Sequence, residues 1–320
     1  LYYWHYPMWH TFFTELGLEV VTSDKTNKNI LDTGIQNALA DACVPVKIFF
    51  GHTLSLKNKV DYLFVPRVVC LNNKTIYCPK FLGMPDMLRY GVSKLPPIID
   101  VTMDVRGQSF GLWKAFRQIG QFLKFSSAQI WSAYLKAKKT DRTYRKMLLS
   151  GLHPPEAIAK LGINLQISAS HASEPPTRPD LTLAVLGYPY EVYDEYISVN
   201  LLQKLKKLNV KVITLENIPP RILYSKANEV SKNMFWTFSD LVLRATRYIY
   251  RKGLADGVIH LTAFSCGPDS IVDRMMEFTS HMNRQIPFMR LSIDEHSGDA
   301  GVSTRLEAFT DMLRRRKEGA

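Results

Sequence analysis

The sequence has 320 residues, of which 46% are hydrophobic and 22% are charged, so its composition excludes a disordered or fibrous chain and predicts a globular protein of two domains. It contains no apolar run near the roughly 20 residues that cross a bilayer and no secretory leader pattern, so we expect a cytoplasmic protein with no membrane partner. Four cysteines are too few for a disulfide scaffold and are expected to be buried thiols, nucleophiles or metal ligands.

The first hundred residues alternate between helical and strand patterns. The stretch FFTELGLEVVT at 12–22 predicts a helix end, a glycine turn and a short buried strand. Farther on, KVDYLFVPRVVC at 59–70 predicts an acidic turn residue, a strand with few charges and then a cysteine. We therefore assign residues 1–108 to a first α/β lobe.

Most of the basic excess lies in the segment that follows this lobe. The net charge is +12, and residues 107–150 hold nine Lys or Arg residues against one acidic residue. Bulky apolar residues recur between them at helical spacing, which predicts a basic amphipathic helical insertion at 109–167. Its charged face is open to three interpretations: a solvated surface, a dock for an acidic partner such as an activase, or a dock for coenzyme A phosphates. No nucleic-acid-binding motif accompanies the charge, so nucleic acid is not an expected partner.

A Ser- and Pro-rich stretch, SASHASEPPTRPD at 168–180, predicts a linker to a second α/β lobe at 181–320. That lobe is expected to open with the strand LTLAVLGYP at 181–189. The helix and strand of LLQKLKKLNVKVIT at 201–214 follow it. The strand and cysteine of LADGVIHLTAFSC at 254–266 come later.

The two lobes repeat one pattern of helix, strand, helical stretch, strand and cysteine at a nearly constant offset of 192 to 196 residues. In that register Cys70 matches Cys266. We interpret the repeat as two similar α/β lobes. At the same offset the first lobe's opening strand would precede residue 1, so we expect one strand of that lobe to be missing from the sequence.

Three of the four cysteines have a proline within two residues. They are Cys43 in ACVPVK, Cys78 in IYCPKF and Cys266 in SCGPDS. Proline ends a strand or opens a helix at its first turn, which places the preceding thiol at the end of the strand or the start of the helix. The amino end of a helix lowers the pKa of a thiol and favours the thiolate, which binds metals. Iron–sulfur ligands are often followed by proline.

The spacing of these three cysteines is too long for a local metal finger. Ligand sites of open α/β sheets gather at the carboxyl ends of strands, so we predict that Cys43 and Cys78 meet Cys266 in a cleft between the lobes. The alternative is that they are ordinary buried thiols. For Cys70, which has no neighbouring proline, we expect only a small buried hydrophobe and assign no role.

Charged residues beside the predicted ligands are candidates for a supporting role. Lys47, Lys80 and Arg67 lie within a few residues of the cysteines and would neutralise a thiolate-rich cofactor, the alternative being ordinary surface charge. Asp269 and Ser270 are predicted to cap the helix that follows Pro268.

The acidic stretch DEHSGDAG at 294–301 follows a predicted strand. It offers acid–base groups or a second metal site, and we favour a polar turn before a helix at 304–313. Arg305 is a candidate partner for one of its acids. The polar residues of this stretch are Asp294, Glu295, His296 and Asp299.

Five motifs together resemble a known family. They are LYYWHYPMWHTFF, ACVPVK, YCPKFLGMPDM, SCGPDS and DEHSGDAGVSTRLEAF, spread from residue 1 to about 313. With them the chain is similar to the iron–sulfur component of 2-hydroxyacyl-CoA dehydratases and to the accessory region fused to their ATP-dependent activases. The resemblance implies two Rossmann-like, doubly wound lobes with a helical insertion, and a Gly-Ile-Pro strand ahead of residue 1.

The resemblance also implies a 4Fe-4S cluster held by three cysteines with one iron open. This ligand set carries over onto Cys43, Cys78 and Cys266. Implied partners are an ATP-dependent activase or related subunit and an acyl-CoA, and a dimer is plausible. True dehydratases work as two related subunits, whereas this chain carries one such unit and no phosphate loop.

The function expected on this basis is handling of low-potential electrons in an activase-linked system, with a radical dehydratase-like or reductase-like reaction left open. A single strongly reducing electron would convert a 2-hydroxyacyl thioester to a ketyl radical and permit loss of water. Two alternatives stay open: a cofactor-free bilobed scaffold, and a zinc protein in which His260 or His296 joins the three cysteines.

Overall fold

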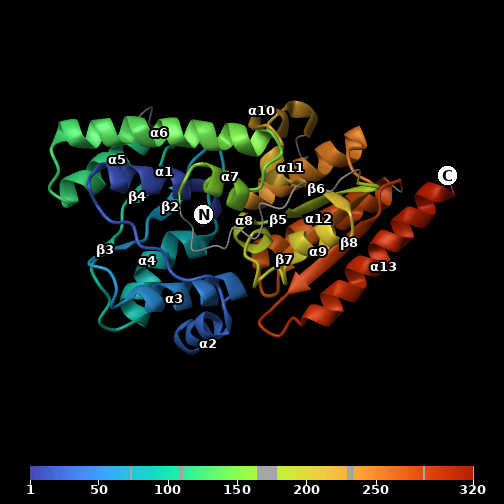
Figure 1. Ribbon diagram of the computed structural model, residues 1–320, viewed down its shortest axis with the longest axis horizontal. Coiled ribbons are helices and arrows are strands. Elements are labelled where there is room, and N and C mark those ends of the chain that lie inside the picture. The colour runs from blue at the N-terminus through green and yellow to red at the C-terminus, as the bar shows by residue number, and fades with distance from the viewer. Residues whose placement is uncertain (73, 108–110, 164–178, 229–233, 284, 320) are drawn as a thin grey trace.

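The computed structural model describes residues 1–72, 74–107, 111–163, 179–228, 234–283 and 285–319, and Figure 1 shows their arrangement. Helices and parallel strands alternate along the chain, which confirms the predicted α/β class. Most of the linker predicted at 168–180, and the ends of the insertion predicted at 109–167, lie outside the described residues. Within the described residues no helix is both long and apolar enough to cross a membrane.

The N-terminal part, residues 1–107, has four helices around short parallel strands. Strand β1 pairs with β3, and β2 pairs with β4. The strand predicted at 59–70 therefore forms, but it is interrupted at Pro66, which has no N–H to donate to a ladder. The elements are α1 (Tyr2–Glu15), α2 (Lys28–Asn37), α3 (Val44–Leu56), β1 (Leu63–Phe64), β2 (Arg67–Cys70), α4 (Pro79–Gly91), β3 (Ile98–Ile99) and β4 (Thr102–Asp104).

The short buried strand predicted within 12–22 is wrong. Helix α1 ends at Glu15 and Gly17 makes the expected left-handed turn at φ 81°, but residues 18–22 form no strand. Val21 is exposed, and none of the strands β1 to β4 pairs with this segment. An apolar run becomes a strand only where a neighbouring strand takes its hydrogen bonds.

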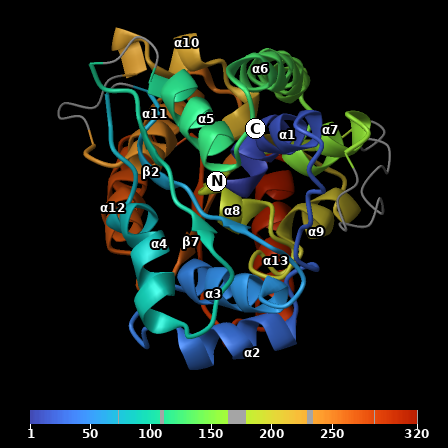
Figure 2. The same cartoon turned by 90° about the vertical axis from the view of Figure 1, so that its left-hand side faces the viewer.

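A helical segment at 111–163 packs over the N-terminal part, as Figure 2 shows from that side. Its helices are α5 (Gly111–Phe122), α6 (Ser127–Leu149) and α7 (Pro154–Lys160). The predicted apolar face is buried only in part: Phe116 is fully buried and stacks on Trp9 of α1 with ring centroids 4.3 Å apart, whereas Trp131 and Leu135 are exposed. Helix α6 starts with a capping box between Ser126 and Gln129.

The C-terminal part, residues 179–319, is built on a four-stranded parallel sheet in the order β6-β5-β7-β8. The strands and helices predicted at 181–189, 201–214 and 254–266 all form. Helix α9 packs with α13 and α11 packs with α12, so the sheet is covered on both faces (Figure 1). Its elements are β5 (Leu181–Gly187), α8 (Pro189–Val192), α9 (Leu201–Lys207), β6 (Val210–Thr214), η2 (Leu215–Asn217), α10 (Pro220–Leu223), η3 (Lys226–Asn228), α11 (Thr237–Lys252), β7 (Gly257–Ala263), α12 (Gly267–Met282), β8 (Phe288–Ile293) and α13 (Asp299–Glu318).

This strand order places a switch point between β5 and β7. After β5 the chain turns to one side and adds β6, and it then crosses to the other side of β5 to add β7. Segments that leave the carboxyl ends of β5 and β7 therefore diverge and leave a crevice, which is where open α/β sheets bind ligands. The residues that follow these two strands thus become the first candidates for a functional site.

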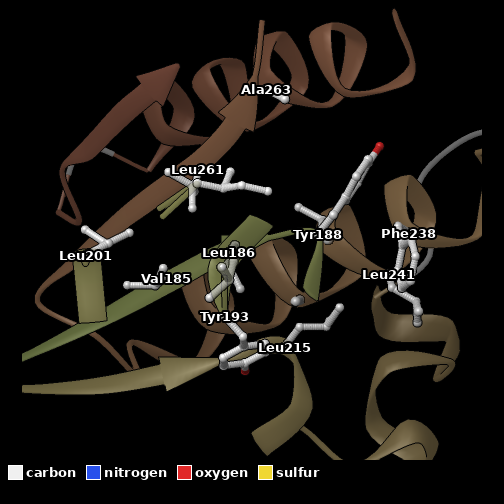
Figure 3. Close-up of a cluster of buried hydrophobic side chains, with 14 of the residues drawn as sticks. Val185, Leu186, Tyr188, Tyr193, Leu201, Leu215, Phe238, Leu241, Leu261 and Ala263 are labelled. Carbon is white, nitrogen blue, oxygen red and sulfur yellow. The ribbon is translucent and has the colours of Figure 1, made fainter. Parts of the chain in front are cut away.

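Aromatic side chains join the N-terminal part to this end of the sheet. Phe238, at the start of α11, is 4% exposed, and Figure 3 shows it beside Tyr188 among the buried side chains. The centroid of the Phe238 ring lies 5.1 Å from that of Trp4 and 5.3 Å from that of Tyr77, both in the N-terminal part. It lies 5.5 Å from the ring centroid of Tyr188 in the C-terminal part. Phe238 therefore contacts both parts at once.

Helices α2 and α3 cross at two glycines. A Cβ atom on Gly34 would lie 1.9 Å from the carbonyl oxygen of Lys47, and one on Gly51 would lie 1.9 Å from that of Ile30. Only glycine lets these two backbones approach so closely. The crossing fixes the position of α3, whose first residue follows Cys43.

We predict that Gly51→Ala lowers the free energy of unfolding by about 3 kcal/mol, because the added methyl group meets backbone that cannot move aside. Urea unfolding followed by circular dichroism measures this change. Gly83→Ala is the matched control, since Gly83 is also helical but its Cβ would meet no described atom within 4 Å. The control should leave stability unchanged or raise it by up to about 1 kcal/mol. Equal stability of the two variants would contradict the prediction.

Candidate functional site

Three helices begin directly after a cysteine. Cys43 is the N-cap residue of α3, Cys78 that of α4 and Cys266 that of α12, with proline at the first or second position of each helix. The sequence prediction that these thiols lie at the amino ends of helices is thus confirmed. Asp269 and Ser270 were expected to cap α12, but Cys266 takes that position and the Ser270 hydroxyl donates to its carbonyl oxygen at 2.9 Å.

The register of the sequence repeat is wrong for the cysteines. It aligned Cys70 with Cys266, but Cys70 ends strand β2, whereas Cys266 precedes a helix. Cys78 holds the place in the N-terminal part that Cys266 holds in the C-terminal part, because each opens the helix after the corresponding strand. Cys70 is completely buried, as expected, and its S–H group donates to Asn72 Oδ1 at 3.7 Å.

The three helix starts lie at the carboxyl edge of the C-terminal sheet. Phe81, in the first turn of α4, lies against Tyr190 of α8 with ring centroids 5.6 Å apart. Lys47, in the first turn of α3, reaches Glu295 in the turn after β8 at 2.7 Å. Cys266 follows β7 directly. These contacts join the two parts at the carboxyl ends of strands. The meeting of the three cysteines in one cleft stays a prediction.

Burial dominates the chemistry of the three thiols. It raises the pKa of Cys43 to about 11, although the backbone amide of Val46 opposes it. Burial also raises the pKa of Cys78 and of Cys266. The expectation of a lowered pKa at helix amino ends is wrong for the protein without a bound cation, because desolvation of the thiolate outweighs the helix dipole.

The thiols act on one another's ionisation. After burial and Glu191, the nearby thiol of Cys78 contributes to the raised pKa of Cys43. Cys43 contributes in turn to the raised pKa of Cys266, after burial, Asp269 and Glu191. A charge affects another group's pKa in this way only when little water separates the two. Cys43 is therefore near both Cys78 and Cys266.

Two buried acids lie in the same place, and sequence reasoning missed the functional interest of both. Glu191 of α8 is 1% exposed, and neither of its carboxyl oxygens has a hydrogen-bond partner among the described residues. Asp269 of α12 is fully buried and its Oδ2 has no partner there either. Burial and the charge of Asp269 raise the pKa of Glu191 well above its ordinary value. The sequence feature that could have indicated Glu191 is a single glutamate within the aromatic run YPYEVY, directly after a buried strand.

Of the three predicted supporting cations, two are close to the thiols or to the cleft. The charge of Lys80 lowers the pKa of both Cys43 and Cys78, against the larger effect of burial. Lys47 is buried and is held by Glu295. Arg67 is engaged elsewhere, since its guanidinium donates to Asp86 at 2.7 Å and to Asp100 at 3.0 Å.

The acidic stretch at 294–301 forms the polar turn that we favoured. Helix α13 starts at Asp299 rather than at Thr304, and Asp294 accepts from the backbone N–H of His296 at 2.9 Å. Arg305 donates to the carbonyl oxygen of Arg290 rather than to an acid of this turn. Glu295 instead joins the two parts of the molecule through Lys47.

His260 on β7 is buried between two carboxylates. Its Nε2 lies 3.2 Å from Asp269 Oδ1 and its Nδ1 lies 3.0 Å from Asp273 Oδ1. Arg290 donates to the other oxygen of Asp273 at 3.0 Å. Burial lowers the pKa of His260, but the two carboxylates outweigh burial and raise it to about 9. Because both ring nitrogens are occupied, His260 has none left for the zinc site considered above.

The donor set matches an iron–sulfur cluster in the chemistry of its side chains. Three thiols are the ligands that iron–sulfur clusters use, and the orphaned oxygens of Glu191 lack the partner that buried polar groups usually have. In the part of the chain that the structure describes, no group of three or more His, Cys, Asp or Glu side chains is placed to hold a metal ion.

These features define a class of protein: a parallel α/β protein in which three helices begin directly after a cysteine, at the carboxyl edge of its C-terminal sheet. The family profile that matches the chain is the CoA enzyme activase uncharacterised domain, over residues 1–218. The match covers more than half of the sequence, so the chain belongs to that family. The matched range includes Cys43, Cys78 and Glu191 and ends before Cys266. The comparison with curated proteins finds no match.

The His260 network predicts a pH dependence of stability. Its pKa is about 9 in the folded protein and near 6.5 when unfolded, so the stabilisation is fully present below pH 6.5 and is lost as pH rises through 9. Between these values stability should fall with a slope of up to about 1.4 kcal/mol per pH unit. Urea unfolding at several pH values measures the slope, which His260→Gln should abolish. An unchanged slope in that variant would rule His260 out as its source.

Proposed function

We propose that this chain is an iron–sulfur protein that handles low-potential electrons in an activase-linked system of the reducing cytoplasm. In this proposal two Rossmann-like lobes, related by the repeat, present Cys43, Cys78 and Cys266 to one 4Fe-4S cluster. The observation that carries it is that all three cysteines open proline-started helices whose first turns lie at the carboxyl edge of the C-terminal sheet. Family membership supports the link to an activase.

The surroundings of the thiols suit an anionic group. Three helices direct their positive amino ends at this place, and a cluster with thiolate ligands carries negative charge. Lys80 adds a cation beside Cys43 and Cys78, and Lys47 is held at the edge by Glu295. When bound, a 4Fe-4S cluster supplies one strongly reducing electron, and one iron without a cysteine offers a site for a substrate oxygen. This chain's residues would hold it, neutralise its charge and keep water from it.

The partners that follow are an ATP-dependent activase or a related subunit, which would deliver the electron, and an acyl-CoA as its final acceptor. The basic outer face of α6 suits either one. Lys139, Arg142 and Lys146 are exposed there, one helical turn apart. Charge of this kind steers an acidic partner or a phosphate group toward the site without selecting between them.

Anaerobic iron and sulfide analysis tests the cluster. We expect about four irons and four sulfides per chain after reconstitution, and loss of most of both in Cys43→Ala, Cys78→Ala and Cys266→Ala. Cys70→Ala is the control, because Cys70 is buried but opens no helix. If the three variants bind iron as well as the parent does, this ligand set is wrong. One zinc and no sulfide would favour the zinc alternative.

A cofactor-free bilobed binding protein is the second candidate, and the raised pKa of the three thiols favours it. Neutral buried thiols are stable without a metal. This candidate predicts no metal in the reconstituted protein and thiols that react independently of one another with an alkylating reagent. Reactivity that is lost together on reconstitution with iron would eliminate it.

A further inference from the structure

Glu191 is a buried acid with no hydrogen-bond partner on either carboxyl oxygen among the described residues. It follows strand β5 on the short helix α8, and its residue is 1% exposed. A buried polar group without a partner is destabilising, and a carboxyl group has two such atoms. Glu191 is the third residue of α8, where a glutamate can accept from the backbone N–H of the residue before the helix, here Tyr188, but neither of its oxygens has a partner at hydrogen-bond geometry.

The position of Glu191 is set by the strand order. Strand β5 lies beside β7, with Gly187 opposite Leu261, so the segments that follow the two strands start next to each other. Glu191 lies on the first of these segments and Cys266 on the second. From the N-terminal part, Phe81 brings the first turn of α4 onto Tyr190, the neighbour of Glu191. The carboxyl group is therefore among the cysteine-capped helix starts.

Two other buried acids show why Glu191 stands out. Asp269 also has one orphaned oxygen, but its Oδ1 is already held by His260 at 3.2 Å. Glu216 has partners on both oxygens: the indole N–H of Trp4 donates to Oε1 at 2.8 Å, and the hydroxyl of Tyr193 donates to Oε2. Only Glu191 among these three has both oxygens available for a ligand.

We propose that Glu191 is the fourth protein ligand of the site, with one carboxylate oxygen bound to the iron that the three cysteines leave open. This inference rests on the iron–sulfur function proposed above. Clusters accept a ligand other than cysteine at individual irons, and the change alters their spectroscopic properties and potential. On loading, the carboxyl proton leaves to solvent as the iron–oxygen bond forms, and no iron changes its oxidation state.

A carboxylate in this position would guard the open iron. It would occupy the coordination site in the resting protein and exclude water and small anions from it. A substrate oxygen would have to displace the carboxylate, since both compete for one position. In this role Glu191 would determine which oxygen ligands can reach the iron, instead of only stabilising the fold.

The test compares the reconstituted parent with Glu191→Gln, using Glu216→Gln as the matched control. Iron and sulfide contents should be equal in all three proteins, because the cysteines are unchanged. After reduction, the electron paramagnetic resonance spectrum of Glu191→Gln should differ from that of the parent. Its unique iron should also bind cyanide at about tenfold lower concentration, of the order that changes in ligand surroundings produce. Glu216→Gln should match the parent in both measurements.

A second measurement needs no cluster. In the metal-free protein, Glu191→Leu removes two orphaned oxygens and should raise the melting temperature by about 2 °C or more, whereas Glu216→Leu breaks two hydrogen bonds and should lower it. A lower melting temperature in Glu191→Leu would show a structural role and overturn the proposal. Identical spectra and cyanide binding in a Glu191→Gln protein that holds its cluster would overturn it as well. A parent chain that takes up no iron would instead overturn the proposed function from which this inference starts.

Discussion

The packing round Phe238 is the interaction on which the candidate site depends. The ring sits where the N-terminal part meets the switch point of the C-terminal sheet, and it is surrounded by aromatic side chains from both. Aromatic pairs at these separations stabilise by about 0.5–1.5 kcal/mol each beyond their buried area, and they fix relative orientation as well as distance. Phe238 contacts Phe81 of α4 and Tyr190 of α8, which also contact each other, so the three rings hold the two helix starts together. The rings in contact with Phe238 are Trp4, Tyr77, Phe81, Tyr188 and Tyr190.

The same packing sets the chemistry by removing water. The helix dipoles favour anions at the amino ends of the three helices, yet burial keeps the thiols protonated. The free energy needed to desolvate a thiolate exceeds the stabilisation that a helix dipole gives it. A bound cation reverses this balance, since metal ligation requires the thiolate and supplies the charge that stabilises it. In the proposed function, deprotonation of the thiols and metal binding would therefore occur together, and the charge of Lys80 beside Cys43 and Cys78 would favour both.

Local patterns in the sequence predicted the elements whose cause is local. The apolar runs of β5 and β7, the amphipathic spacing of α6 and the Cys-Pro helix starts each depend on a few neighbouring residues, and all of them form. The segment at 18–22 failed because a strand depends on a partner that the segment itself does not encode. The register of the repeat failed because Cys70 and Cys78 are only eight residues apart. Glu191 was missed because desolvation is produced by residues distant in sequence, and a single glutamate does not reveal it.

The extent of the family match has a structural consequence. Residues 1–218 include β5 and β6, but β5 also pairs with β7, from Leu183 opposite Gly257 to Gly187 opposite Leu261. The matched range alone would leave that edge of β5 without its ladder, and it would supply two of the three cysteines. Because β7 both completes the sheet and carries Cys266 at its carboxyl end, the fold and the candidate site are completed by the same strand. A change that prevents β7 from pairing with β5 is therefore expected to remove the third cysteine from the site and expose the orphaned carboxyl of Glu191 together.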